Sequence, residues 1–230
     1  ASVAEGIIYA ADNGAKVINM SLGFMMPVPL VKEAVQYAID KGVIVVAAAG
    51  NDASDYVSYP AGFEGVISVG SINSKKELSY FSTYGPSVDV VAPGEDVYST
   101  MYDYSKKSTF ANGSGTSMAS PVVAGVVALL LSKHPNLTPA QVEYVLEQTA
   151  DDLGETGFDT KYANGLVNPV KALSYDVKSI PSTVKESWTE DEILTKAEEV
   201  DSVEKIVKEG NITKPYEQKW IKFDVKKGDY

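Results

Sequence analysis

The chain contains no cysteine, no arginine and no long apolar run, and each absence argues against particular kinds of site, partner or membrane span. Without cysteine, it can form neither a disulfide framework nor a thiolate metal site. All 20 basic residues are lysine, and the net charge of −11 disfavours nucleic acid or an anionic membrane surface as a partner, because both favour basic patches. The longest apolar stretch, 122–131, is too short to cross a bilayer, which takes about 20 residues.

Strand patterns alternate with helical patterns along most of the chain. The strand 43–49 is continuously apolar, which is typical of a strand buried on both faces of a parallel sheet. The helix 117–133 is apolar nearly all round, as expected of a buried central helix. We therefore predict an α/β fold, a three-layer sandwich around a mainly parallel sheet. The other predicted strands are 17–20, 66–69 and 88–91, and the other predicted helices are 3–13, 30–40 and 138–149.

The composition changes after about residue 176. Residues 176–213 are acidic and rich in lysine, and they form either a linker or a solvated helix. Within 214–230, the segment 220–225 alternates apolar and polar residues, which predicts the first strand of a truncated β-domain. Residues 1–175 are the predicted main domain.

Ser117 lies in the run Asn112-Gly-Ser-Gly-Thr-Ser-Met-Ala-Ser-Pro121, where a glycine-rich turn leads into an apolar helix. Backbone N–H groups at the start of a helix have no intrahelical partner, and the helix dipole adds positive potential there. A serine at this point can therefore act as a nucleophile whose own N–H stabilises an oxyanion. The alternative is that Ser117 only caps the helix.

Two further residues are expected at the same edge of the sheet. Asn51 follows the strand 43–49, where parallel sheets form their sites, and its carboxamide can donate to an oxyanion unless it only shapes a turn. Gly23, after the strand 17–20, leaves an open backbone edge for an extended peptide. In a nearby loop, Tyr59-Pro60 is a candidate cis peptide bond.

Taken together, the segments 17–23, 43–51, 89–94 and 115–121 resemble the subtilisin-like serine proteases, the subtilases of peptidase family S8. The segments 132–136 and 165–168 match the same family, so the resemblance covers about residues 1–175. It implies the subtilisin-like sandwich, truncated at its N-terminus and followed by a C-terminal extension.

The resemblance also assigns site residues. It implies that Ser117 is the nucleophile and that Asn51 is the oxyanion-hole asparagine. Asp89 lies near a weak cation site of some relatives, but we predict a surface aspartate and no metal ligand in this chain. Met118 matches an oxidation-sensitive methionine of the family. The implied substrate-binding residues are Ser21, Leu22, Gly23, Ala48, Ala49, Gly50, Tyr59, Pro60, Gly115 and Thr116.

The histidine base and its aspartate are missing from the chain. The family orders its triad Asp, His, Ser, so both are expected before Ala1. The only histidine, His134, lies 17 residues after Ser117, roughly 25 Å away along a helix. A general base must come within about 3 Å. His134 is therefore predicted to cap a helix C-terminus, and the isolated chain is predicted to be inactive.

The resemblance implies that the parent protein is a secreted serine endopeptidase that forms an acyl-enzyme on Ser117. Its expected partners are an extended peptide or protein substrate and a propeptide. No cofactor is expected in this chain, and calcium is implied for the full-length protein. The alternative is a non-catalytic peptide-binding module on a degenerate protease scaffold. A different α/β hydrolase is disfavoured, because Ala119 replaces the last glycine of Gly-x-Ser-x-Gly.

Overall fold

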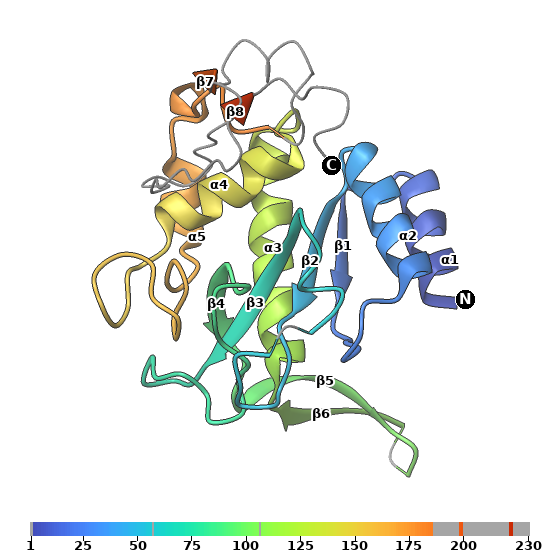
Figure 1. The fold of residues 1–230 in the computed structure, drawn as a ribbon. Helices are drawn as coiled ribbons and strands as arrows, with labels where there is room; N and C mark the ends of the chain where they lie inside the picture. The colour runs from blue at the N-terminus through green and yellow to red at the C-terminus, as the bar shows by residue number, and fades with distance from the viewer. Residues whose placement is uncertain (1, 57, 106, 186–197, 200–220, 223–230) are drawn as a thin grey trace, which may run out of the picture. The chain divides into compact units, whose positions relative to one another are not determined.

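A computed structural model describes residues 2–56, 58–105, 107–185, 198–199 and 221–222 (Figure 1). The chain divides into two compact units, Ala1–Ile180 and Pro181–Tyr230. The first unit contains a parallel sheet in which sequence order is also spatial order, β1-β2-β3-β4. Its strands are β1 (Val17–Met20), β2 (Ile44–Ala48), β3 (Val66–Ile72) and β4 (Val90–Pro93). The predicted parallel sheet is confirmed.

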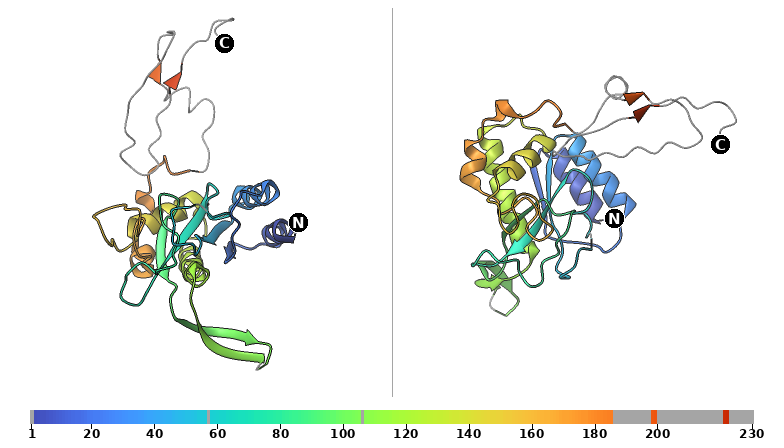
Figure 2. Two further views of the ribbon diagram at one scale, coloured as in Figure 1. Left: turned by 60° about the horizontal axis from the view of Figure 1, so that its bottom comes forward. Right: turned by 60° about the vertical axis from the view of Figure 1, so that its left-hand side comes forward.

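Helices cover both faces of this sheet, so the predicted three-layer sandwich is also confirmed (Figures 1 and 2). Side chains of β2 alternate between two cores. Ile44 and Val46 pack in the cluster that includes α3, whereas Val45 and Ala47 pack in the cluster that includes α1 and α2. The helices are α1 (Ser2–Asp12), α2 (Pro29–Asp40), α3 (Thr116–Lys133), α4 (Pro139–Thr149) and α5 (Pro169–Ser174).

The central helix α3 is less enclosed than its composition predicts. By length and composition it could cross a membrane. One side packs into the core through Ala119, Val123 and Val127, as in the core helix of a globular protein. The opposite side leaves Val122 and Leu129 exposed. The expectation of a helix buried all round was therefore wrong, because an apolar composition does not show which side of a helix meets the sheet.

An antiparallel hairpin is the element that the sequence patterns did not reveal. It consists of β5 (Val97–Asp103) and β6 (Lys107–Gly113), and it extends from the edge of the sandwich as a ribbon (Figure 2). Tyrosine, threonine, valine and phenylalanine, which favour strands, make up much of it. Because β6 ends at Gly113, the hairpin leads directly into the start of α3.

The C-terminal predictions lie mostly outside the described residues. In the first unit, a short 3-10 helix, η1 (Val177–Ser179), follows α5. In the second unit, β7 (Glu198–Glu199) pairs in parallel with β8 (Ile221–Lys222). Residues 186–197, 200–220 and 223–230 of the predicted linker or helix and of the predicted β-domain are outside the described residues.

Gly94, just after β4, supports the start of α3, and we expect Gly94→Ala to destabilise the fold. Its carbonyl accepts a hydrogen bond from the Gly115 N–H at 2.8 Å. An added Cβ would lie 2.5 Å from Ser71 Oγ, 2.7 Å from the Gly115 carbonyl oxygen and 3.0 Å from Ala119 Cβ. Such crowding should lower the free energy of unfolding by about 1–3 kcal/mol, measured by denaturant titration.

The matched control is Gly125→Ala in α3. Gly125 is exposed, and a Cβ there would have no neighbour within 4 Å. Alanine favours helix by roughly 0.5–1 kcal/mol over glycine, so the control should stabilise the chain. Equal stability of the two variants would rule out crowding at Gly94.

Candidate active site

Ser117 is the second residue of α3 and lies beside the carboxyl edge of the sheet. The turn before it depends on Gly115, the N-cap residue, whose φ of 153° is a conformation that glycine adopts far more readily than other residues. The Met118 N–H donates to the Gly115 carbonyl at 2.9 Å, which closes the first turn. The N–H of Ser117 is among the helix-start donors without an intrahelical acceptor.

Asn51 is held against this helix start by Thr116. The Asn51 Oδ1 accepts from the Thr116 N–H at 2.8 Å and from the Thr116 hydroxyl at 3.0 Å. Thr116 is fully buried, and its hydroxyl lies 3.2 Å from the backbone nitrogen and oxygen of Gly50. Among the described residues, the Asn51 Nδ2 has no hydrogen-bond acceptor. The carboxamide is thus oriented by its oxygen, and its N–H groups remain available as donors.

A chain of hydrogen bonds ties the end of β1 to the first turn of α3. The Ser120 hydroxyl donates to Asn19 Oδ1 at 2.7 Å, and Asn19 Nδ2 donates to Ser21 Oγ at 3.1 Å. The Ser21 hydroxyl then donates to the Ser117 carbonyl oxygen at 2.8 Å, and the Ser117 Oγ lies 3.5 Å from the Ser21 carbonyl oxygen. The predicted substrate-binding strand and the predicted nucleophile therefore form one connected unit.

Two glycines of the predicted substrate-binding segments, Gly23 and Gly50, both lie close to Ser58. An added Cβ on Gly23 would lie 2.5 Å from Ser58 Oγ, and one on Gly50 would lie 3.3 Å from Ser58 Cβ. Ala48 and Ala49 are buried, and the Ala49 N–H donates to the Val69 carbonyl at 3.0 Å. Sequence reasoning missed Ser58, since no pattern marks a loop serine that fits between two glycines.

The loop that contains Tyr59 and Pro60 is attached to the chain just beyond β1. The peptide bond between these residues is cis, as predicted. The Phe24 N–H donates to the Tyr59 carbonyl at 2.6 Å, and the Tyr59 N–H donates to the Phe24 carbonyl at 2.9 Å. This pair of bonds fixes the loop beside Ser21, Leu22 and Gly23.

The only histidine in the chain lies at the far end of α3 from Ser117. His134 is the C-cap residue of that helix, where its backbone N–H donates to the Leu130 carbonyl. Its Nε2 is buried and has no hydrogen-bond partner among the described residues. All of α3 separates this imidazole from the nucleophile, so His134 cannot act as its base.

A half-buried acidic group lies elsewhere, and it corrects the prediction that Asp89 is a surface aspartate. Asp89 Oδ2 accepts from the Ser68 N–H at 2.6 Å, and burial raises the pKa of this carboxyl to about 7. Glu143 and Glu147 of α4 bring carboxylate oxygens within 4.8 Å of it. Burial, and then the charge of Asp89, raises the pKa of Glu147 to about 8. Near neutral pH this group therefore retains protons.

These raised pKa values predict that the chain loses stability as the pH rises. The folded protein holds protons on Asp89 and Glu147 that the unfolded chain releases above its ordinary carboxyl pKa of about 4. The free energy of unfolding should therefore fall between about pH 4 and pH 8. Glu147→Gln mimics the protonated form, so it should reduce this fall and raise stability at about pH 8, as measured by urea unfolding.

The control for this experiment is Glu5→Gln, which changes an exposed glutamate of α1. It should leave the difference in stability between acidic and mildly basic pH as it is in the unmodified chain. An unmodified chain that is equally stable at both pH values would contradict the prediction.

Comparison with known proteins matches residues 1–165 to the subtilase family. Thermitase of Thermoactinomyces vulgaris is 47% identical over 174 residues, which are 76% of this chain and 60% of thermitase. A thermophilic serine proteinase of Bacillus sp. (strain AK1) is 47% identical over 173 residues, 75% of this chain and 41% of that protein. The chain therefore spans only part of the length of these relatives.

Solved structures give the same result. The crystal structure of fervidolysin from Fervidobacterium pennivorans, a keratinolytic enzyme related to subtilisin, matches with a TM-score of 0.68 and 37% identity. The match covers 76% of this chain and 29% of that one.

Proposed function

Because the chain belongs to the subtilase family, we propose that it is the part of a secreted serine endopeptidase that carries the nucleophile. One observation carries the proposal: Asn51, oriented through its Oδ1 by Thr116, lies beside the helix start that presents Ser117. A helix that needed only a cap would not require an amide donor fixed next to it. Neutral donors fixed beside a nucleophile are what acyl transfer needs.

The proposed reaction proceeds through an ester on Ser117. A histidine from outside this chain removes the proton of the Ser117 hydroxyl as its oxygen attacks the carbonyl carbon of the peptide bond. The Asn51 Nδ2 and the Ser117 N–H donate to the oxyanion. The C–N bond then breaks, and the histidine passes its proton to the leaving amine. Water hydrolyses the ester by the same route, and an aspartate, also outside this chain, orients the histidine.

The substrate is proposed to lie extended along the segment 21–23, with 48–50 forming a wall of the pocket for one of its side chains. Gly23 is exposed, which leaves its backbone accessible for recognition by added strand pairing. A propeptide would occupy the same position before activation. Acyl transfer on this site uses no cofactor, and the calcium implied by the resemblance is expected outside this chain.

The first test is active-site labelling. We expect the 230-residue chain alone to hydrolyse no peptide and to leave a fluorophosphonate unreacted, because no base is within reach of Ser117. A protein that extends the chain through the coding sequence before Ala1 should be labelled at Ser117, located by mass spectrometry of the modified peptide. Labelling of the 230-residue chain itself would contradict the first expectation.

An extended protein that binds peptides but takes no label would contradict the endopeptidase proposal. That result would favour the non-catalytic peptide-binding module, for which the exposed segment 21–23 after β1 is the supporting observation.

A further inference from the structure

The β5–β6 hairpin, called the ribbon below, exposes most of its residues. All side chains from Tyr98 to Tyr102 are exposed, and β6 alternates between exposed and half-buried positions. In the described part of the chain its sheet has two strands, so the outer edge of each strand has no strand beside it. Isolated two-stranded sheets are marginally stable, and open edges attract further strands. The ribbon is therefore suited to receive a partner.

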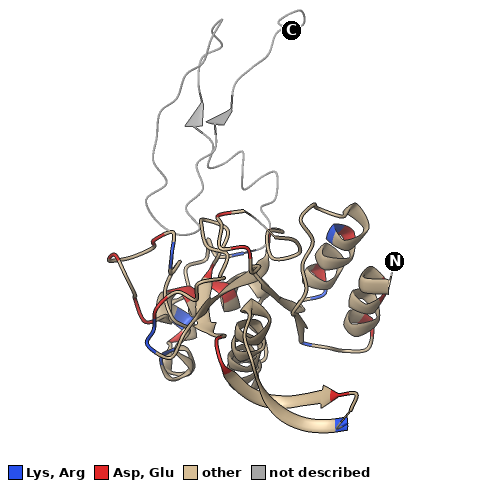
Figure 3. Cartoon of the chain, turned by 90° about the horizontal axis from the view of Figure 1, so that it is seen from below, with Lys and Arg blue, Asp and Glu red and all other residues tan. Residues whose placement is uncertain are grey.

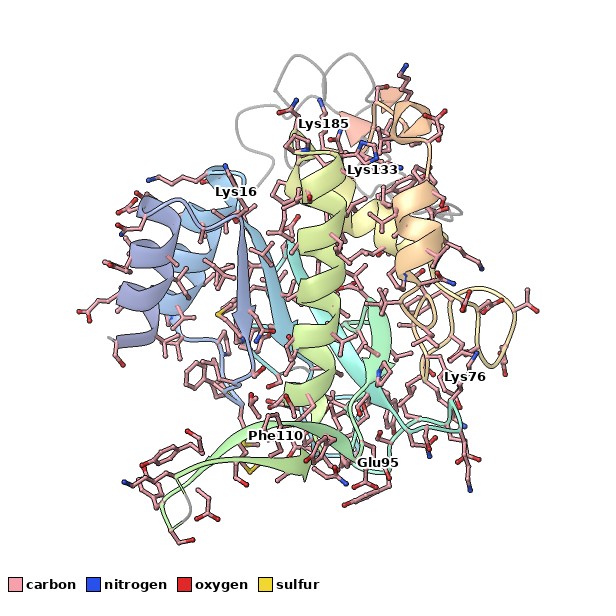
Figure 4. All side chains as sticks on the ribbon, turned by 180° about the vertical axis from the view of Figure 1, so that it is seen from behind. Lys16, Lys76, Glu95, Phe110, Lys133 and Lys185 are labelled. Atoms are coloured by element: carbon pink, nitrogen blue, oxygen red, sulfur yellow. The ribbon has the colours of Figure 1, made fainter. Side chains whose placement is uncertain are left out.

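Aromatic side chains gather on one face of the ribbon. The register places Phe110 opposite Thr100, which puts it on the same face as Tyr98 and Tyr102. Tyr98 and Phe110 stack with ring centroids 5.8 Å apart, and Tyr102 meets Tyr104 edge-on at 5.4 Å. All four rings are exposed, Tyr104 by 95%. We call these four rings the aromatic stripe; Figure 4 labels Phe110 within it.

Between residues 97 and 113 the charged residues are Asp103, Lys106 and Lys107, so the ribbon carries little charge although the chain as a whole is strongly acidic. Its charged strand residues, Asp103 and Lys107, face each other in the register near the tip. Figure 3 shows the length of the ribbon without charged residues and the acidic residues at its two ends. Over most of its length the ribbon therefore offers uncharged side chains and open strand edges.

The ribbon is continuous with the candidate active site. β6 ends at Gly113, and Ser117 follows four residues later. A strand of seven residues is about 20–24 Å long at roughly 3.4 Å per residue. A polypeptide lying along the ribbon would therefore reach Ser117 within a few residues of its own length.

We propose that the ribbon binds the flank of an extended polypeptide substrate, one with little charge and with apolar side chains at alternate positions. The substrate adds as an edge strand, and its alternate side chains pack on the aromatic stripe. The proposal rests on the endopeptidase function, because that function supplies a substrate that emerges beside Gly113. It makes affinity depend on substrate length: a short peptide spans only the site at Ser117, whereas a longer one also covers the ribbon.

The test compares two fluorescent peptides that bind to the 230-residue chain. Both are uncharged and alternate leucine with threonine, one of about 6 residues and one of about 16, long enough to cover the ribbon as well. Fluorescence anisotropy should show the long peptide binding at least about tenfold tighter. The double variant Tyr98→Ser/Phe110→Ser should lose this advantage, with no change in affinity for the short peptide.

The matched control is Tyr9→Ser, which removes a ring of equal exposure from α1, 70% for Tyr9 against 71% for Tyr98. It should keep the advantage of the long peptide. Circular dichroism should show all variants folded. Hydrogen exchange should slow in β5 or β6 when the long peptide binds, which a general loss of folding would not produce.

The proposal is overturned if the double variant binds the long peptide as well as the unmodified chain does. It is also overturned if sedimentation shows that the unmodified chain dimerises and the double variant does not, since the ribbon then pairs with a second copy. The endopeptidase proposal is tested separately, by fluorophosphonate labelling of Ser117 in the extended protein. If the long peptide binds more tightly than the short one and the double variant loses this difference, the ribbon is supported as a polypeptide-binding site whatever the outcome of labelling.

Discussion

Replacing Ser117 with alanine in the protein that carries the whole triad is expected to lower kcat by about 10⁶, the loss known for this change in subtilisin, a member of the same family. Without the hydroxyl no ester can form, so the two-step route is closed. The backbone turn should survive, because it depends on Gly115 and on the carbonyl of Gly94, not on the serine side chain. Hydrolysis of a peptide amide under saturating substrate is the measurement.

The control for Ser117→Ala is Ser114→Ala, which removes another hydroxyl in the same glycine-rich turn. Ser114 is exposed, and its Oγ accepts from the Asp96 N–H at 3.0 Å and makes no hydrogen bond to Asn51 or Ser117 among the described residues. We expect the activity of this variant to stay within about twofold, as for most surface changes. Unchanged kcat in Ser117→Ala would mean that another group attacks the substrate.

Replacing Asn51 with alanine should lower kcat by about 10²–10³ and leave KM nearly unchanged, the size known for the oxyanion asparagine of subtilisin. Under the proposed function, the Nδ2 would donate to charge that develops only in the transition state, so its loss should not weaken substrate binding. Asn51→Asp should be at least as damaging, because a carboxylate cannot donate and adds negative charge beside the oxyanion.

Variants of Thr116 test the orientation of the Asn51 carboxamide separately from the loss of its Nδ2 donor. Thr116→Val keeps the backbone hydrogen bond to Asn51 Oδ1 and removes the one from the hydroxyl, so it should reduce kcat less than Asn51→Ala does. Thr116→Ser, which keeps the hydroxyl, should restore the rate. A rise in KM with kcat unchanged in Asn51→Ala would place this residue in substrate binding and remove it from the oxyanion site.

Local patterns predicted the parallel sheet and its helices because each has a local cause. The strand at Val43 to Ala49 is apolar without interruption, since β2 is buried on both faces. The capping box at Thr138 starts α4 where its spacing places it, with the Thr138 hydroxyl bonded to the Gln141 N–H. Gly115 marks the turn before α3 for the same reason, because few other residues adopt its backbone conformation.

What the sequence did not reveal depends on contacts between distant segments. Thr116 was predicted to contact substrate, yet its hydroxyl is turned toward Gly50 and Asn51, which no local pattern encodes. Asp89 was predicted to lie at the surface, because a single aspartate gives no sign that two glutamates of α4 will pack against it. The ribbon was not predicted because its exposed strands lack the alternation of apolar and polar residues found in strands with one buried face.

The hydrogen bonds that join the segment after β1 to α3 also determine the stage of folding at which the candidate active site forms. Ser21 and Ser117 are 96 residues apart in the chain, and Asn51 and Thr116 are 65 apart. Contacts this remote in sequence form late, since a large loop must close before they gain anything. A growing or half-folded chain therefore holds a serine with no oriented amide beside it. Under the proposed function, the nucleophile would therefore gain its oxyanion donor only after the chain has folded.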